Sequence, residues 1–191
     1  MKIGLYFGSF NPIHIGHLII ANHIANHSDV NQIWFVVSPQ NPLKQSAQLL
    51  NEYQRLHLVR VAIEDNPLFK ASDIEFKLPK PSYTIDTLTY LQEKYPHYSF
   101  SVIMGGDSFS NITRWKNYSI ILKDYPIIVY NRPGFDLSSQ RQLATNITML
   151  DAPLLDISAT TIRTYIKQGK SIKYLVSDAV QKELIEYGYY K

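Results

Sequence analysis

Apolar residues along the chain form two alternating patterns, short continuous runs and helically spaced stretches. Short, mainly apolar runs bounded by Gly, Pro, Ser or Asn predict buried strands. These runs lie at residues 3–7, 33–37, 68–71, 100–104, 127–130 and 147–150. Apolar residues spaced by three or four positions predict helices. These stretches lie at residues 17–26, 51–63, 83–95, 160–167 and 177–187.

The alternation of strands and helices predicts the fold class. Right-handed βαβ units build a doubly wound, Rossmann-like α/β fold, with a mostly parallel sheet and helices on both faces. Ligands of such sheets bind beyond the carboxyl ends of the strands, where the strand order reverses. Because no repeat, low-complexity tract or linker interrupts the pattern, we expect one domain over residues 1–191, with a C-terminal helical portion from about residue 158.

The helix predicted at 51–63 is amphipathic. Tyr53, Leu56, Val59 and Ile63 fall on one face, and Arg55 and Arg60 fall elsewhere. The next helix follows Ser82, a residue type that commonly caps a helix N-terminus.

Composition narrows the classes of protein. The 191 residues are 45% hydrophobic and 18% charged, a balance that can fill a core. The net charge is 19 − 16 = +3 without a basic run, which does not favour a nucleic-acid partner. With no cysteine, the chain has no disulfide, thiolate metal site or cysteine nucleophile.

No stretch approaches the roughly 18 consecutive apolar residues of a membrane span. The N-terminal apolar run is broken at residues 8–12, too early for a signal peptide. We therefore expect a cytoplasmic protein without a membrane partner, and the sequence leaves homo-oligomer formation open.

The first strand and first helix are joined by the string G-S-F-N-P-I-H-I-G-H, residues 8–17. A turn of this kind holds phosphate, because free backbone N–H groups and the helix dipole point at the anion. His14 and His17 lie at the helix mouth, where they could donate to phosphate oxygens. The alternative is a Gly/Pro loop with two incidental, solvated histidines.

A second motif, I-S-A-T-T-I-R at residues 157–163, opens a later helix. By itself it could be a capped helix with a surface Arg. Together, the two strings resemble the G-x-F-x-P-x-H-x-G-H and I-S-x-T-x-x-R signatures of the nucleotidyltransferases related to class I aminoacyl-tRNA synthetases. No K-M-S-K-S-like loop or anticodon-binding region is present, which argues against a synthetase fragment.

Further elements make the chain resemble the bacterial nicotinate mononucleotide adenylyltransferases almost from end to end. They are the P-S-Y-T string at 81–84, a G-x-D string within G-G-D-S at 105–108, Trp115, the R-P-G string at 132–134, and Lys44 in a basic loop. The chain departs from the family pattern at Ser9, Asn11, Leu43 and Lys116. None of these departures falls on His14, His17, Ser158 or Arg163.

The resemblance implies that the 5′-phosphate of nicotinate mononucleotide attacks the α-phosphate of ATP directly and in line. The products are nicotinate adenine dinucleotide and pyrophosphate, with no covalent enzyme intermediate. The implied catalytic residues are His14, His17, Ser158, Arg163 and Lys44. Mg²⁺ is expected to arrive with ATP, since the motifs contain no dedicated carboxylate cage.

The resemblance also assigns substrate contacts. For ATP they are Gly8, Ser9, Phe10, His17, Gly105, Asp107, Arg132, Ser158, Thr160 and Arg163. For the mononucleotide they are Thr84, Trp115 and Lys44. The backbone N–H groups after Trp115 and the Lys116 side chain add donors that favour the acid over the amide of the pyridine ring.

Several of these residues have purely structural alternatives. Asp107 could cap the short helix after its strand, Trp115 could anchor a core, Thr84 could simply open a helix, and Arg132 could cap a turn. His23 and His27 form an H-x-x-x-H pair of the kind that can bind zinc, but no third ligand follows. We therefore expect surface histidines and no metal site.

Two other functions remain open from sequence alone. A related adenylyltransferase would use another acceptor, such as nicotinamide mononucleotide or pantetheine phosphate. A nucleotide-sensing module would keep the pocket without turnover, yet His17 and Arg163 are both intact.

Overall fold

The computed structural model describes residues 1–40, 49–131, 146–153 and 155–191. Its strands form one six-stranded sheet in the order β3-β2-β1-β4-β5-β6. The strands are β1 (Lys2–Gly8), β2 (Gln32–Val37), β3 (Phe69–Ser72), β4 (Ser99–Gly105), β5 (Ile127–Tyr130) and β6 (Ile147–Leu150). Every neighbouring pair is parallel, and all six predicted strands are confirmed. The strand order reverses between β1 and β4.

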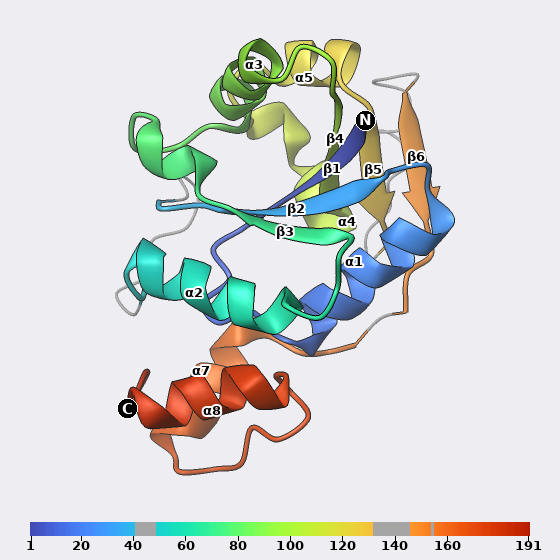
Figure 1. The fold of residues 1–191 in the computed structure, drawn as a ribbon. Coiled ribbons are helices and arrows are strands. Elements are labelled where there is room, and N and C mark those ends of the chain that lie inside the picture. The colour runs from blue at the N-terminus through green and yellow to red at the C-terminus, as the bar shows by residue number, and fades with distance from the viewer. Residues whose placement is uncertain (41–48, 132–145, 154) are drawn as a thin grey trace.

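Helices cover both faces of this sheet, as predicted (Figure 1). The α-helices are α1 (Ile15–His27), α2 (Glu52–Ile63), α3 (Thr84–Lys94), α4 (Gly106–Ser110), α5 (Tyr118–Asp124), α7 (Ala159–Lys167) and α8 (Asp178–Glu186), with 3₁₀ turns at η1 (Ile74–Lys77) and η2 (Ile112–Arg114). Successive residues of a strand point to opposite faces. Phe35 therefore packs in the core under α1 and α2, while Trp34 and Val36 pack in the core under α3 and α5.

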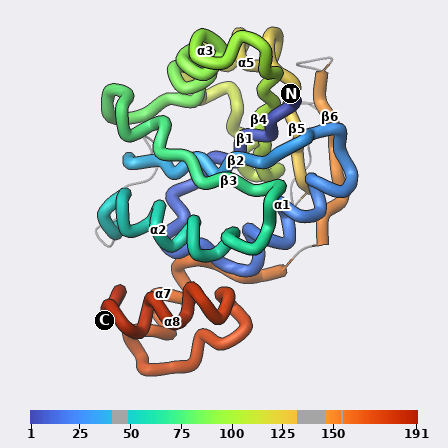
Figure 2. Tube along the Cα trace, viewed as in Figure 1, coloured from blue at the N-terminus to red at the C-terminus, as the bar shows by residue number. Residues whose placement is uncertain are grey.

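The two C-terminal helices do not cover the sheet. Figures 1 and 2 show α7 and α8 beside α1 and α2, on the side away from the strands. His57 Nε2 on α2 lies 2.7 Å from Glu183 Oε2 on α8, and Leu184 is buried in the same core as Phe35. The C-terminal helices thereby extend the core on the α1 and α2 face.

The amphipathic face of α2 is confirmed at Leu56, Val59 and Ile63, which are buried, but Tyr53 and Arg55 differ from their prediction. Tyr53 is 63% exposed, whereas Arg55 is completely buried. The Arg55 side chain lies on the buried face of α2, because it is at helical spacing from Leu58, Val59 and Ala62. The prediction counted apolar residue types and therefore assigned Arg55 to the wrong face.

The short elements α5, η1 and η2 were not predicted from the pattern, and α4 was considered only as the short helix that Asp107 could cap. Each has seven residues or fewer, so it spans no more than about two helical turns. So short a segment shows no resolvable apolar period, and its sequence is as typical of a loop as of a helix.

Ser82 does not cap α3, which corrects the sequence prediction. The N-cap is Tyr83, and the Ser82 hydroxyl donates instead to Glu75 Oε2 at 2.8 Å. Thr87 Oγ1 donates to Glu75 Oε1 at 2.9 Å. Burial raises the pKa of Glu75, whose side chain is only 2% exposed, although hydrogen bonds from Ser82, Ser38 and Thr87 oppose that rise.

We predict that Glu75 makes the protein less stable as pH rises above the ordinary glutamate pKa of 4.5. In the unfolded chain this carboxyl ionises near that value, whereas in the folded protein it keeps its proton to higher pH. The free energy of unfolding therefore falls as pH rises from the unfolded pKa to the folded pKa. Glu75→Gln should remove this component. The melting temperature of Glu75→Gln minus that of the wild type should grow from pH 4 to pH 8, and a constant difference would contradict the prediction.

Candidate active site

The loop that follows β1 lies at the carboxyl ends of β1 and β4, where the strand order reverses. Phe10 in this loop has φ = 44° and is 3% exposed. A non-glycine residue in that region is strained by about 1–3 kcal/mol, so neighbouring contacts must hold it. A Cβ built on Gly8 would lie 2.7 Å from Phe10 Cζ. Gly8 is therefore required because the Phe10 ring covers its Cα.

Asn11 connects this loop to distant parts of the chain. Its Oδ1 accepts hydrogen bonds from the Tyr190 hydroxyl at 2.6 Å and from the Leu50 N–H at 3.2 Å. Its backbone oxygen accepts from Arg163 Nη1 at 2.8 Å. The departure from the family's Asp to Asn thus leaves an oxygen acceptor where the loop needs one.

The two motif histidines are packed rather than solvated. The His14 backbone N–H donates to His17 Nδ1 at 3.2 Å, and the two rings stack with centroids 3.7 Å apart. Because Nδ1 accepts a backbone proton, neutral His17 carries its own proton on Nε2. Phe10 and Tyr6 meet the His17 ring edge-on, at 5.1 and 6.1 Å between centroids. His14 is buried and His17 is partly buried, so the two histidines are packed and not freely solvated.

The second motif adds an arginine beside the same loop. Ser158 caps α7, where its Oγ accepts from the Thr161 N–H at 3.1 Å, so it has the capping role that the sequence left open. Arg163 is half-buried and donates to Asn11 O and to Thr160 Oγ1, the latter at 3.1 Å. Arg163 Nε is buried and has no hydrogen-bond partner among the described residues. Arg163 is therefore not a free surface side chain.

The other side of the switch point is formed by β4 and β5. Gly105 is the N-cap of α4, so Asp107 lies in the first turn and the capping alternative for it is wrong. A Cβ on Gly105 would lie 2.5 Å from Asp107 Oδ1 and 3.0 Å from the Tyr130 hydroxyl oxygen. The Tyr130 and Tyr6 hydroxyls lie 3.5 Å apart. Tyr6, which also meets His17, thus connects this side to the histidines.

Thr84 and Trp115, two of the residues expected at the mononucleotide, lie toward the opposite face of the sheet. Thr84 opens α3, whose N-terminus lies at the carboxyl edge because crossover helices run antiparallel to parallel strands. Trp115 is half-buried and packs against the core under α3 and α5. Lys116 Nζ pairs with both Asp86 carboxylate oxygens at 2.9 Å and lies 4.8 Å from the Tyr83 ring centroid. Lys116, which we expected to donate to the substrate, is therefore already paired with Asp86.

Two predicted site residues, Lys44 and Arg132, lie outside the described residues. Within the described ranges no group of three His, Cys, Asp or Glu side chains could hold a metal ion. In the same part of the chain, no helix is long and apolar enough to cross a bilayer.

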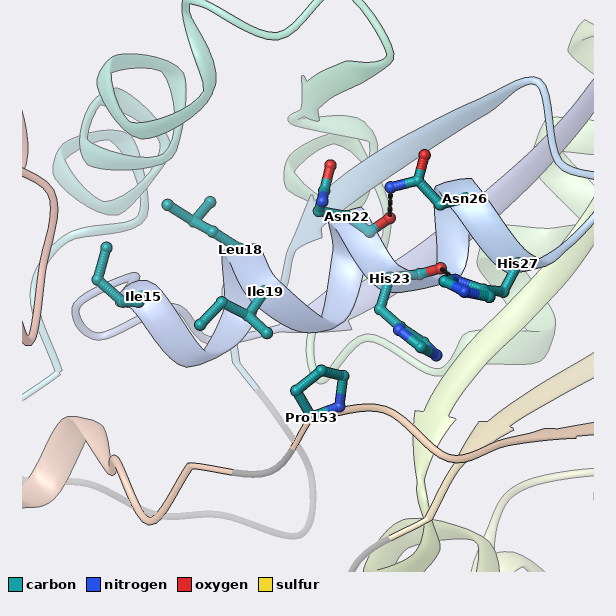
Figure 3. A pocket seen from close by; sticks show the side chains of 8 residues that line it. All are labelled: Ile15, Leu18, Ile19, Asn22, His23, Asn26, His27 and Pro153. Carbon is teal, nitrogen blue, oxygen red and sulfur yellow. Dashed lines mark hydrogen bonds between the residues drawn. The ribbon is translucent and has the colours of Figure 1, made fainter.

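A shallow depression of about 370 Å³ follows the outer side of α1 (Figure 3). His23 and His27 stack there with ring centroids 4.0 Å apart, and His27 Nδ1 lies 2.9 Å from the His23 carbonyl oxygen. Both rings lie at the surface, in the C-terminal half of the helix and away from the loop after β1. The other end of the depression is lined by Ile15, the first residue of α1, so the depression extends along the helix to the edge of the candidate active site.

The sequence analysis did not identify two residues that hold the loop after β1, Arg55 on α2 and Tyr190 near the C-terminus. Tyr190 gave no signal, because the penultimate residue of the chain matches no motif. Arg55 could have been found from its helical spacing to Leu58, Val59 and Ala62.

Comparisons with known proteins agree with this geometry. The Cytidylyltransferase-like family model matches residues 5–165. A relative in Cytophaga hutchinsonii, named "Probable nicotinate-nucleotide adenylyltransferase", is 54% identical over 190 residues, covering 100% of this chain and 98% of its own. A relative of the same name in Flavobacterium psychrophilum is 53% identical and covers 100% of both chains.

Solved structures share the fold. The nicotinic acid mononucleotide adenylyltransferase of Plasmodium falciparum complexed with NaAD aligns with a TM-score of 0.85 at 22% identity, covering 99% of this chain and 97% of that one. The same enzyme complexed with APC aligns with a TM-score of 0.82 at 20% identity, covering 99% and 96%. From the full-length identity to its relatives and the match to the family model, the chain belongs to the cytidylyltransferase-like family and, within it, to the nicotinate-nucleotide adenylyltransferases.

Proposed function

We propose that the protein transfers the adenylyl group of ATP to nicotinate mononucleotide, releasing pyrophosphate and forming nicotinate adenine dinucleotide, a step of NAD biosynthesis. The observation that carries this proposal is the packed His14–His17 pair beside Arg163 at the switch point. Full-length relatives at 54% and 53% identity bear the name of that activity, which supports the acceptor as well as the donor.

The chemistry needs alignment and charge compensation more than a protein nucleophile. A phosphate monoester is already anionic and nucleophilic at neutral pH. Its oxygen attacks the α-phosphorus of ATP, a new P–O–P bridge forms, and the bond to the β,γ-pyrophosphate breaks with its electron pair on the leaving group. The site must hold two polyanions in line and stabilise the charge that moves to the leaving oxygen.

The residues beside the loop suit this task. His17 offers its Nε2 proton, because its Nδ1 is occupied by the His14 N–H. Arg163 has a buried Nε without a partner among the described residues, and each Nη keeps a second N–H, beyond its bond to Asn11 O or Thr160 Oγ1, that can donate to the leaving phosphates. The N-terminus of α1 has no acidic residue in its first turn, so its dipole also favours an anion.

We assign the mononucleotide to the side that carries Thr84 and Trp115. An indole is suited to stacking on a pyridine ring, and the N-terminus of α3 favours a carboxylate. Because Lys116 is paired with Asp86, we assign the preference for the acid to the helix N-terminus and the Thr84 hydroxyl instead.

We expect Mg²⁺ to bind together with ATP, as part of the nucleotide substrate. Coordinated to the ATP phosphates, it would neutralise charge on them, a role typical of phosphoryl-transfer sites. The need for ATP supports a cytoplasmic location for the reaction.

The direct test of this function measures dinucleotide and pyrophosphate from ATP with either mononucleotide. We predict turnover with nicotinate mononucleotide and a kcat/KM at least about 10²-fold lower for the amide, because the amide NH₂ would leave buried donors unpaired. Equal rates would show that the acceptor side is misassigned. No product with either mononucleotide, although ATP binds, would contradict catalysis and favour nucleotide sensing.

A second prediction separates the two nitrogens of His17. His17→Asn keeps an acceptor near the Nδ1 position but loses the Nε2 donor, and His17→Ala loses both. Both variants should lower kcat by about 10²-fold or more, since that donor acts where charge develops. His17→Asn should melt within a few degrees of the wild type. If steady-state assays show His17→Asn within about threefold of wild-type kcat, the donor role of Nε2 is refuted.

A further inference from the structure

Arg55 is a fully buried arginine that lies directly beneath the loop after β1. Its guanidinium donates four hydrogen bonds, all to backbone carbonyl oxygens. Nη1 reaches Ser9 at 2.6 Å and Ser38 at 2.8 Å. Nε reaches Leu50 at 2.8 Å, and Nη2 reaches Pro39 at 3.2 Å. One side chain thus joins the loop after β1, the end of β2 and the entry to α2.

The charge of Arg55 has no acidic partner at ion-pair distance among the described residues. Glu52, one turn earlier on α2, pairs with Lys80 at 2.7 Å instead and acts on Arg55 only at longer range. Burial lowers the pKa of Arg55, yet a guanidinium stays protonated at neutral pH. Carbonyl dipoles solvate this cation without neutralising it. A buried cation normally has an anionic partner, so its net charge here is an unusual feature.

The hydrogen bond to Ser9 also fixes which way the loop presents its donors. The Ser9 carbonyl and the Phe10 N–H belong to one planar peptide unit, in which they point in opposite directions. Because Arg55 binds the Ser9 oxygen, the Phe10 N–H is turned away from the protein interior occupied by Arg55. The same relation turns the Gln40 N–H away from Arg55, since the guanidinium also binds the Pro39 oxygen.

We propose that Arg55 is a positioning residue for polyphosphate binding: it turns the N–H groups of the loop toward the phosphates of the nucleotide, and its unpaired charge strengthens their binding from beneath. The identity of the anion as the triphosphate of ATP rests on the proposed function. A purely structural Arg55 would stabilise the fold without changing the affinity of the folded protein for phosphate.

The test compares Arg55→Met and Arg55→Lys with Leu58→Ala, a cavity variant at another buried position of α2. Binding of inorganic tripolyphosphate and of ATP is measured by titration calorimetry, well below the melting temperature of each variant. Arg55→Met should raise both dissociation constants by about tenfold or more, because charge-assisted contacts to phosphate are strong.

Arg55→Lys should also weaken binding, since an ammonium cannot reach all four carbonyls and loses its proton more easily when buried. Leu58→Ala should lower the melting temperature and leave both dissociation constants within about twofold, because a core cavity affects stability and not the anion site.

Wild-type affinity for tripolyphosphate in folded Arg55→Met would overturn the proposal. If Arg55→Met does not fold, Arg55→Lys decides, and wild-type affinity in that variant would overturn it equally. Tripolyphosphate binding requires no acceptor. If the wild type made no dinucleotide, the proposed function would be refuted, but the comparison of tripolyphosphate affinities would remain valid.

Discussion

The candidate site depends on a loop held in a conformation that it would not adopt alone. Phe10 lies in the left-handed region with its ring over Gly8, a strained arrangement that must be stabilised from outside. The stabilising contacts come from Tyr190 and Arg163, which bind Asn11, and from Arg55, which binds the Ser9 oxygen. The last helices of the chain are thereby required for the geometry of its first turn.

The supported loop lies beside other groups that suit anions. The parallel sheet brings the ends of β1 and β4 together and sets helix N-termini at the same edge. Tyr6 and Tyr130 connect the two sides through their hydroxyls, and the Tyr6 ring contacts His17. Backbone N–H groups, helix N-termini and arginines held in place before a substrate binds would suit a reaction that needs no protein nucleophile.

The sequence predicted the parts of the fold whose signal is local. Six strands, five helices and the two motifs were located because apolar period and turn residues report on neighbouring positions. The burial of Arg55 and the start of α3 at Tyr83 were not predicted. The helical spacing of Arg55 to Leu58, Val59 and Ala62 was a local signal, but the carbonyls that solvate its charge come from other segments, and Glu75 binds the Ser82 hydroxyl that was expected to cap α3. The Tyr190–Asn11 contact spans 179 positions, and no pattern within either segment reports it.

We propose that the polyphosphate of ATP lies on the loop after β1, between His17 and Arg163. A crystal structure with a non-hydrolysable ATP analogue tests it most directly. The account predicts phosphate oxygens within about 3 Å of His17 Nε2 and of the Arg163 guanidinium, at the N-terminus of α1. A triphosphate bound away from the loop, touching neither side chain, would contradict it.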